Sequence, residues 1–270
     1  MELIDTHCHL DAAEFKDNFD TRLNKAQSAN ITTHIIPGVT QNGWNPILSM
    51  CRKRNGLFPA LGLHPMFVQQ HLPAHMDELE TLAQQSTLVA IGEIGLDYYL
   101  PDIDKKEQQL LFEQQLHIAQ SAALPVLLHV RKAHDQVLAT LRKKHFPCGG
   151  IVHAFSGSYQ QASQYITLGF TIGFGATLTY SRAKRIRAIA AKLPQQAIVL
   201  ETDAPDMPPA RYRGTTNHPE YILETLAILA ELRSDSPKNV ARYTTANARH
   251  ILNLVPYSVK PVKKQVETSR

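Results

Sequence analysis

The chain has 270 residues, of which 43% are hydrophobic and 19% are charged, so it can bury a large core and is not disordered over most of its length. Its formal net charge of +4 is compatible with an anionic substrate but is too small to indicate one. Three separated cysteines without a CxxC pair exclude a disulfide framework and are typical of a reducing compartment.

Neither a membrane span nor a secretion signal is indicated. No apolar run approaches the ~20 residues that a membrane-spanning helix needs. Glu2 and Asp5 stand where a signal peptide would carry basic residues. We therefore expect a cytoplasmic protein and, because nothing in the sequence requires an oligomer, a monomer.

Eight short apolar runs predict strands at 3–9, 33–39, 58–64, 88–95, 125–131, 150–157, 170–176 and 197–203. Between them lie longer segments with apolar residues at helical spacing, such as 104–123 and 182–193. Strands that alternate with helices pair in parallel through right-handed crossovers. This pattern favours a single (β/α)8 TIM barrel, of the α/β class, over an open doubly wound sheet. That alternative is also weakened because no G-x-G-x-x-G follows the first strand.

After the eighth predicted strand, a loop rich in Pro and Arg leads to helical segments near 219–233 and 237–252. We expect these to be extra C-terminal helices. Residues 255–270 are polar and basic and lack periodicity. The predicted organisation is one barrel domain over residues 1–254 and a flexible basic tail over residues 255–270.

Histidine and acidic residues recur where the predicted strands end. The first strand ends in "THCH", which puts His7 and His9 on one face and Cys8 on the other. Taken alone, the pair could belong to a zinc-finger-like knuckle, a surface loop or an active site. The carboxyl ends of barrel strands form one face, where active sites are built, so this position favours an active site. Cys8 is expected to pack against a helix.

Four further polar residues close apolar strands: Glu93, His129, His153 and Asp203. Burial of Glu93 is costly unless the carboxylate is paired or bound to a metal. The alternatives are an exposed strand end for Glu93 and ordinary core histidines for His129 and His153. Together with the first pair, these residues match the ligands of zinc or a similar divalent ion. The predicted metal ligands are His7, His9, Glu93, His129, His153 and Asp203.

Six ligands are more than one tetrahedral ion requires. We expect two ions, one held by His7, His9 and Asp203 and the other by His129 and His153, with Glu93 between them. Two-metal sites with ions ~3.5–4 Å apart are typical of phosphatases and nucleases.

Motifs in the same order along nearly the whole predicted barrel carry a family resemblance: "DTHCHLD" (5–11), "GLHP" (62–65), "IGEIGLDYY" (91–99), "PVLLHVR" (125–131), "HAFSG" (153–157) and "ETDAP" (201–205). With them the chain resembles the TatD-type metal-dependent hydrolases, a nuclease branch of the amidohydrolase-like barrel superfamily. The resemblance implies the same metal sites with Glu93 as the bridge. Related barrels carry a carbamylated lysine at that position, where this chain has Glu.

The resemblance also implies an activity. Members of the family are Mg²⁺-, Mn²⁺- or Zn²⁺-dependent deoxyribonucleases, often 3′-to-5′ exonucleases on single strands, and some have no settled substrate. This chain departs from the family after the eighth strand, where "TNHPEYI" (216–222) has His218 in place of an acidic residue. The expected partner is therefore nucleic acid, namely single-stranded DNA or RNA ends, with a substrate preference that this segment can alter.

The expected reaction is phosphodiester hydrolysis by a metal-bound hydroxide, because a bound cation lowers the pKa of water toward ~7. Asp203 is expected to orient the hydroxide and accept its proton, and Glu93 to bridge the ions, so both are predicted catalytic residues. His64, which ends the third strand, is the first candidate for substrate contact. Arg131, Arg211 and Arg213 are further candidates, with surface ion pairs or solvated loops as the alternatives.

Two other functions stay open at this stage. A two-metal barrel could hydrolyse a small ester, lactone, amide or phosphomonoester. A barrel could also bind metal or nucleic acid without turnover, although the presence of all six ligands argues against a degenerate enzyme. A basic, aromatic groove next to the metals would favour the nuclease. Tyr98, Tyr99 and the cations at 182–187 are candidates for it, or simply an exposed surface.

Overall fold

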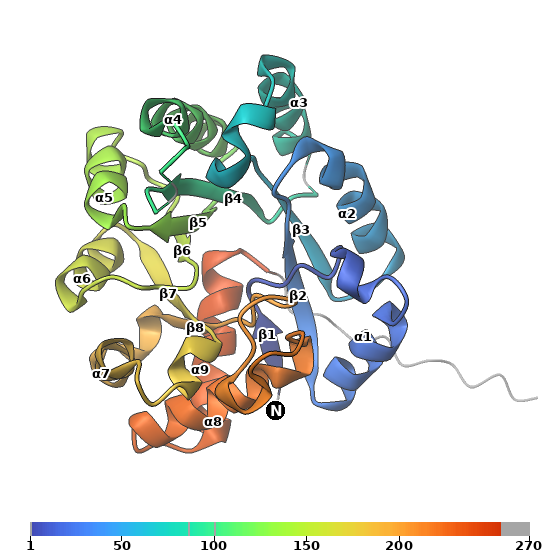
Figure 1. The fold of residues 1–270 in the computed structure, drawn as a ribbon, viewed down its shortest axis with the longest axis vertical. Helices are drawn as coiled ribbons and strands as arrows, with labels where there is room; N and C mark the ends of the chain where they lie inside the picture. The colour runs from blue at the N-terminus through green and yellow to red at the C-terminus, as the bar shows by residue number, and fades with distance from the viewer. Residues whose placement is uncertain (1, 86, 100, 255–270) are drawn as a thin grey trace, which may run out of the picture.

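Eight parallel strands form a nearly closed barrel in the computed structural model, which describes residues 2–85, 87–99 and 101–254 (Figure 1). Neighbours in the sequence are neighbours in the sheet, in the order β1 to β8. The strands are β1 (Leu3–Asp5), β2 (Ile31–Pro37), β3 (Leu57–Leu61), β4 (Ala90–Asp97), β5 (Val126–Arg131), β6 (Gly150–Val152), β7 (Phe170–Phe174) and β8 (Ile198–Leu200). The predicted TIM barrel is confirmed.

The helices surround the strands (Figure 1). They are α1 (Phe19–Ser28), α2 (Gln41–Lys53), α3 (Pro73–Ala83), α4 (Lys105–Ser121), α5 (His134–Lys143), α6 (Tyr159–Thr167), α7 (Lys184–Lys192), α8 (Ile222–Leu232) and α9 (Pro237–Ile251). Short 3-10 helices are η1 (Ala13–Phe15), η2 (Pro65–Gln70), η3 (Ala176–Thr179), η4 (Gln195–Ala197), η5 (Ala210–Tyr212) and η6 (Pro219–Tyr221). Within the described residues, every helix is too short or too polar to cross a membrane.

The strands are apolar on both faces because each is covered on both sides, as in other parallel sheets. One face packs under the helices. The other fills the barrel, where a separate apolar cluster joins seven strands to the end of α9; it comprises Ile4, Ile35, Ala60, Ala90, Leu127, Ile151, Val199, Ala248, Leu252 and Leu254. The barrel interior is therefore a packed core, and its polar chemistry is confined to the carboxyl ends of the strands.

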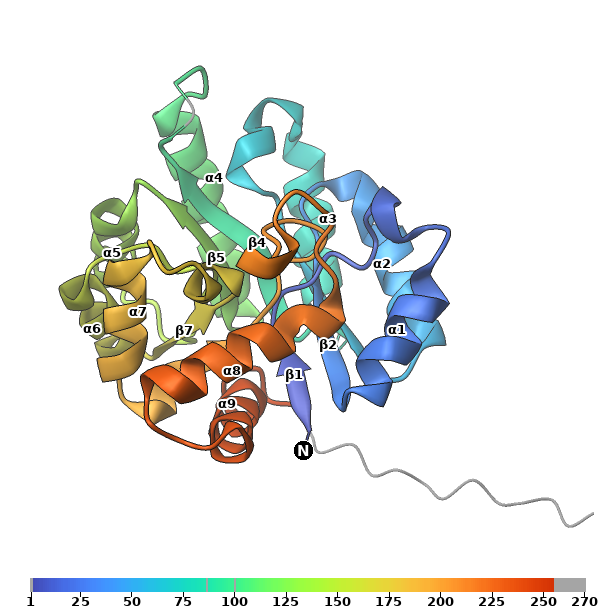
Figure 2. The ribbon, with the colours of Figure 1, turned by 60° about the horizontal axis from the view of Figure 1, so that its bottom comes forward.

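The first and last strands meet through polar groups. The Thr6 backbone N–H donates to the Leu200 carbonyl at 3.1 Å. The buried Asp5 carboxylate accepts from the Thr202 N–H at 2.9 Å and from the Thr202 hydroxyl at 2.6 Å. Both predicted C-terminal helices are present: α9 packs against β8 and β1, and α8 lies against α7 and η3 (Figure 2).

Several predicted strands extend beyond the observed ones. The first was expected to run through residue 9, but β1 ends at Asp5. Beyond it, the Cys8 N–H donates to the Ile35 carbonyl and the His9 N–H to the Ala204 carbonyl, so the backbone bonds to both sides without a regular ladder. His7 and His9 therefore stand on an irregular segment above the barrel. The predicted tail, 255–270, lies outside the described residues.

Candidate metal centre

The six predicted ligands come from five strands but meet at one face of the barrel. His7 and His9 follow β1, Glu93 lies in β4 and His129 in β5. His153 follows β6 and Asp203 follows β8. Three overlapping groups of ligand atoms, each within 4.8 Å, result: His7, His153 and Asp203; His7, His9 and Glu93; and His64, Glu93 and His129. Parallel strands bring them together because their carboxyl ends share one edge.

Four atoms form the first half of the centre. His7 Nε2 lies 3.1 Å from Glu93 Oε2 and 3.8 Å from Asp203 Oδ1. His9 Nε2 lies 3.8 Å and 3.7 Å from the same two oxygens. Ligands at about 2.1 Å from a tetrahedral zinc are about 3.4 Å apart, so these separations fit one divalent ion.

The second half is built on the other oxygen of Glu93. Glu93 Oε1 lies 3.0 Å from His129 Nδ1 and 3.4 Å from His64 Nε2. One carboxylate thus faces both halves, one oxygen to each. This is the arrangement required of a bridging ligand.

His153 joins the first half more closely than the sequence suggested. Its ring stacks on that of His7 with centroids 3.6 Å apart, and its Nε2 lies 3.6 Å from Asp203 Oδ2. Asp203 therefore stands between His153 on one side and His7 and His9 on the other. The assignment of His153 to the second ion, beside His129, stays a prediction.

The protonation of His64 follows from its hydrogen bonds. Its Nδ1 accepts from the Met66 backbone N–H at 3.1 Å, so the neutral ring carries its proton on Nε2. That N–H points to Glu93 Oε1 and cannot offer a lone pair to a metal at the same time. His64 is buried, and its geometry suits a hydrogen-bond donor to the centre; its contact to substrate stays a prediction.

Asp97 is a site residue that the sequence reasoning missed. The His129 Nε2 is hydrogen-bonded to Asp97 Oδ2 at 3.1 Å. With the proton on Nε2, the Nδ1 lone pair is left for the centre. The Gln108 side chain binds both backbone groups of Asp97, at 2.8 and 2.9 Å, and thereby holds β4 against α4. The signal was available, because residues 93 and 97 are separated by an even number along one strand.

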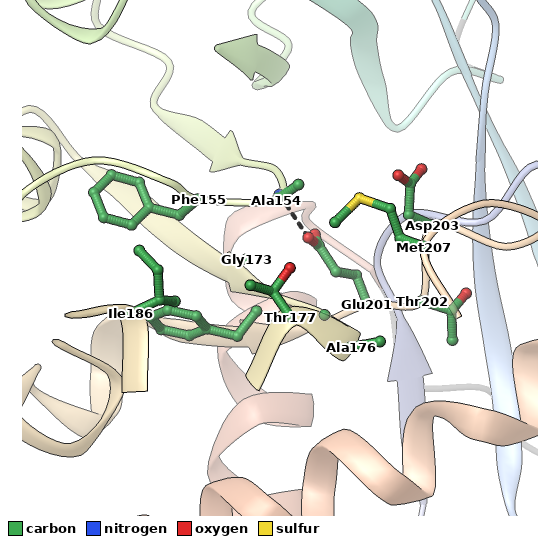
Figure 3. Close-up of a pocket in the computed structure, with 12 residues that line it drawn as sticks. Ala154, Phe155, Gly173, Ala176, Thr177, Ile186, Glu201, Thr202, Asp203 and Met207 are labelled. Atoms are coloured by element: carbon green, nitrogen blue, oxygen red, sulfur yellow. Dashed lines mark hydrogen bonds between the residues drawn. The ribbon is translucent and has the colours of Figure 1, made fainter. Parts of the chain in front are cut away.

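Glu201 supports His153 in a similar position. Its Oε1 lies 3.1 Å from His153 Nδ1 and accepts from the Ala154 N–H at 2.6 Å, a bond drawn in Figure 3. Space for this carboxylate depends on Gly173, where an added Cβ would lie 2.3 Å from Glu201 Oε2. Asp5 has a comparable role at β1, since it also accepts from the His7 N–H at 3.3 Å.

The electrostatic field of the centre favours a cation. Burial opposes charge on Glu93, but the neighbouring histidines His7 and His64 outweigh it and hold its pKa well below the usual range. Burial would likewise lower the pKa of His129, yet Asp97 and Glu93 raise it to about 9. Glu201 and Asp203 overcome burial at His153 and raise its pKa to about 10. Nitrogen and carboxylate donors in such a field fit a divalent ion.

The predicted arginine contacts lie outside these groups. Arg131 stacks over the Tyr99 ring at 3.8 Å and lies 4.0 Å from Asp97 Oδ2. Arg211 is exposed and 3.6 Å from Glu224, and Arg213 is exposed. His218 packs on Phe15 and Tyr221 rather than in the centre. The departure from the family motif is thus separated from the predicted ligands.

Comparison with known proteins gives the same kind of relative over nearly the whole chain. The family model described as TatD related DNase matches residues 4–253. An uncharacterized metal-dependent hydrolase, YjjV of Escherichia coli K12, is 37% identical over 93% of this chain and 98% of its own length. A similar hydrolase of Haemophilus influenzae is 36% identical over 94% and 100%.

Solved structures share the fold. The crystal structure of YjjV, a TatD homolog, superposes with a TM-score of 0.91 at 37% identity, covering 94% of this chain and 98% of that one. A TatD family hydrolase from Entamoeba histolytica gives a TM-score of 0.82 at 21% identity over 93% and 98%.

Proposed function

The chain belongs to the TatD family of metal-dependent hydrolases, and on that premise we propose that it is a phosphodiesterase, specifically a deoxyribonuclease of the 3′-to-5′ exonuclease type. Its substrate would be the ends of single-stranded DNA or RNA, and its cofactors two divalent ions, Zn²⁺, Mg²⁺ or Mn²⁺.

One observation carries the proposal: the two oxygens of Glu93 face different sets of histidine nitrogens, at 3.1 Å on one side and 3.0 Å on the other. A carboxylate shared between two sets of donors suits a pair of ions rather than one. Paired ions are used in nucleases and phosphatases to stabilise the attacking and leaving oxygens of an in-line displacement.

For these ions we keep the ligand sets expected from the sequence. His7, His9, Glu93 and Asp203 would hold one ion; Glu93 and His129, with His153, would complete the other. When bound, the ions would polarise the phosphoryl group and lower the pKa of a water molecule.

The remaining residues position substrate and protons. With Glu93 Oε1 turned to an ion, the Nε2–H of His64 would be free to donate a hydrogen bond to a phosphoryl oxygen. The Asp203 side chain is 16% exposed whereas that of Glu93 is 4% exposed, so Asp203 is the carboxylate that can reach an attacking water and accept its proton. Arg131, Arg211 and Arg213 stay candidates for contacts to phosphates further along the strand.

The test is digestion of 5′-labelled single-stranded DNA by metal-stripped protein with Mg²⁺, Mn²⁺ or Zn²⁺ added back. We expect a ladder that requires metal and shortens from the 3′ end. Asp203→Asn should slow it by at least about a hundredfold, the range of a lost proton acceptor. The control is Asp102→Asn, an exposed carboxylate of another loop, which should cleave as the wild type does. Absence of cleavage with every metal, at two bound ions per chain, would refute the nuclease.

A further inference from the structure

We propose that a groove beside the metal centre, between η3 and the loop after β8, binds the nucleotide next to the scissile phosphodiester. We call it the Tyr180 groove; its lining residues are Thr177, Tyr180, Arg182, Ala183, Met207 and Pro208. The inference rests on the proposed nuclease function and names a subsite for that substrate.

The Tyr180 groove borders a small cavity at the edge of the centre. Thr177 and Met207 line the groove and also line this cavity, whose wall includes Glu201 and Asp203. Figure 3 shows the Met207 side chain beside the Asp203 carboxylate. Met207 is 42% exposed, so a substrate that contacts Asp203 meets this thioether as it leaves the centre.

The small cavity and the Tyr180 groove differ greatly in volume. The small cavity has a volume of about 10 Å³, which is room for about one water molecule. The Tyr180 groove has about 520 Å³, within the range of pockets that hold nucleotide-sized ligands. A substrate on Asp203 therefore extends over Met207 into the groove and not past Glu201.

Hydrogen bonds hold the two walls of the groove together. The Tyr180 hydroxyl donates to the Pro208 carbonyl at 2.9 Å, and the Ala210 N–H donates to the Thr179 hydroxyl at 2.8 Å. The buried Asn217 amide donates to the carbonyls of Asp206 and Met207 at 2.8 and 3.3 Å. A groove formed before the ligand arrives loses less conformational entropy on binding.

The lining chemistry suits a base and its phosphate. Tyr180 and Met207 present an aromatic ring and a polarisable thioether, on which a base of any sequence can stack. The Arg182 guanidinium lies 5.4 Å from the Tyr180 ring and, within the described part of the chain, has no carboxylate within 4.0 Å. The guanidinium groups of the nearby Arg185 and Arg187 already have partners, because they donate hydrogen bonds to the carbonyls of Ser156 and Leu178. An unpaired guanidinium beside an apolar platform favours a nucleotide over a peptide or acyl group.

The test measures binding separately from cleavage. A fluorescein-labelled dodecathymidylate with phosphorothioate linkages, which retain the charge, is titrated with metal-loaded protein and followed by anisotropy. Arg182→Gln should weaken binding about tenfold, the effect of one lost charge-assisted hydrogen bond, and reduce the salt dependence by about one counterion. Met207→Ala should weaken it about threefold to tenfold. The controls are Lys184→Gln, at the start of α7 just after Arg182, and Leu223→Ala, an exposed apolar residue, both expected to bind as the wild type.

Hydrolysis of bis(p-nitrophenyl) phosphate, a diester without a neighbouring nucleotide, completes the test. The kcat and KM of Arg182→Gln and Met207→Ala for this diester should stay within about twofold of wild type. Equal losses on the small diester would instead make the groove part of the general phosphate site and overturn the inference. So would oligonucleotide binding that the groove variants leave unchanged, or no oligonucleotide binding at all. Binding that depends on the groove without any DNA cleavage would refute the nuclease and leave the subsite standing.

Discussion

The imidazole of His129 is hydrogen-bonded at Nε2 to Asp97 Oδ2, at 3.1 Å, while its Nδ1 faces Glu93 Oε1 at 3.0 Å. One ring therefore joins a fully buried carboxylate behind the centre to the carboxylate that faces both halves of it. Asp97 is itself fixed, since its other oxygen accepts from the Tyr99 N–H at 2.9 Å. The orientation of His129 is thus determined by a residue that touches no predicted ion.

This relationship gives a prediction for Asp97→Asn. The amide keeps the size of the side chain but no longer requires the proton on His129 Nε2, so affinity for the metal ion that His129 would hold should fall about tenfold to a hundredfold. Isothermal titration of metal-stripped protein measures it. Asp102→Asn, an exposed substitution, is the control. Unchanged affinity for both ions would show that Asp97 serves only the fold.

Glu93→Gln tests the bridge. The amide has one oxygen, so it cannot offer an acceptor to both halves of the centre. Metal content by mass spectrometry should fall from two ions per chain to one or fewer, with hydrolysis lost. Glu107→Gln, at the exposed start of α4, should leave the metal content unchanged. Two tightly bound ions in Glu93→Gln would contradict the bridging assignment.

Gly173→Ala should disturb the centre by steric contact. The new Cβ would lie 2.3 Å from Glu201 Oε2 and 2.9 Å from Glu201 Cδ, so the buried carboxylate must move from His153. We expect a loss of about 1–3 kcal/mol in the free energy of unfolding, as for other overpacked interiors. In the control Gly43→Ala, in α2, the nearest atoms are at 4.0 Å, so stability should be equal or up to about 1 kcal/mol higher. Urea titration of both variants measures the free energies of unfolding. Equal stabilities of the two variants would be evidence against the contact between the new Cβ and Glu201.

The buried side chain of His34, which is not part of the metal centre, should make the stability of the fold depend on pH. Both of its ring nitrogens are buried without a hydrogen-bond partner among the described residues, and burial lowers its pKa from 6.5 to about 4. Between these values the unfolded chain binds the proton and the folded chain does not. Stability therefore falls as the pH falls from 6.5 toward 4, at up to about 1.4 kcal/mol per pH unit.

The variant His34→Leu removes the ring that takes up a proton on unfolding. Its advantage in unfolding free energy over the wild type should grow as the pH is lowered from 7 to 5, measured by urea titration at each pH. His117→Leu, an exposed histidine of α4, should follow the wild type instead. A difference between His34→Leu and wild type that is constant with pH would contradict the prediction.

Local pattern was enough to predict the fold. Each strand is an apolar run between helical periods, and eight repeats of that unit leave few topologies other than a barrel. The candidate ligands could also be predicted from their positions. Burial of a polar residue at the end of an apolar strand is costly unless the residue is paired or binds a metal. Strand ends were less accurate, as at His7 and His9, since the hydrogen bonds that replace the ladder come from Ile35 and Ala204.

The sequence by itself determined the barrel, the order of its strands and the face on which the histidines and carboxylates gather. Only the tertiary structure decided which atoms face one another: the two sides of Glu93, the proton on His64, and the support of His129 by Asp97. These depend on side-chain rotamers and on contacts between distant segments, such as Asp5 with Thr202, 197 residues apart. Periodicity reports which face a residue occupies, whereas a hydrogen bond requires two atoms to meet within a few tenths of an ångström.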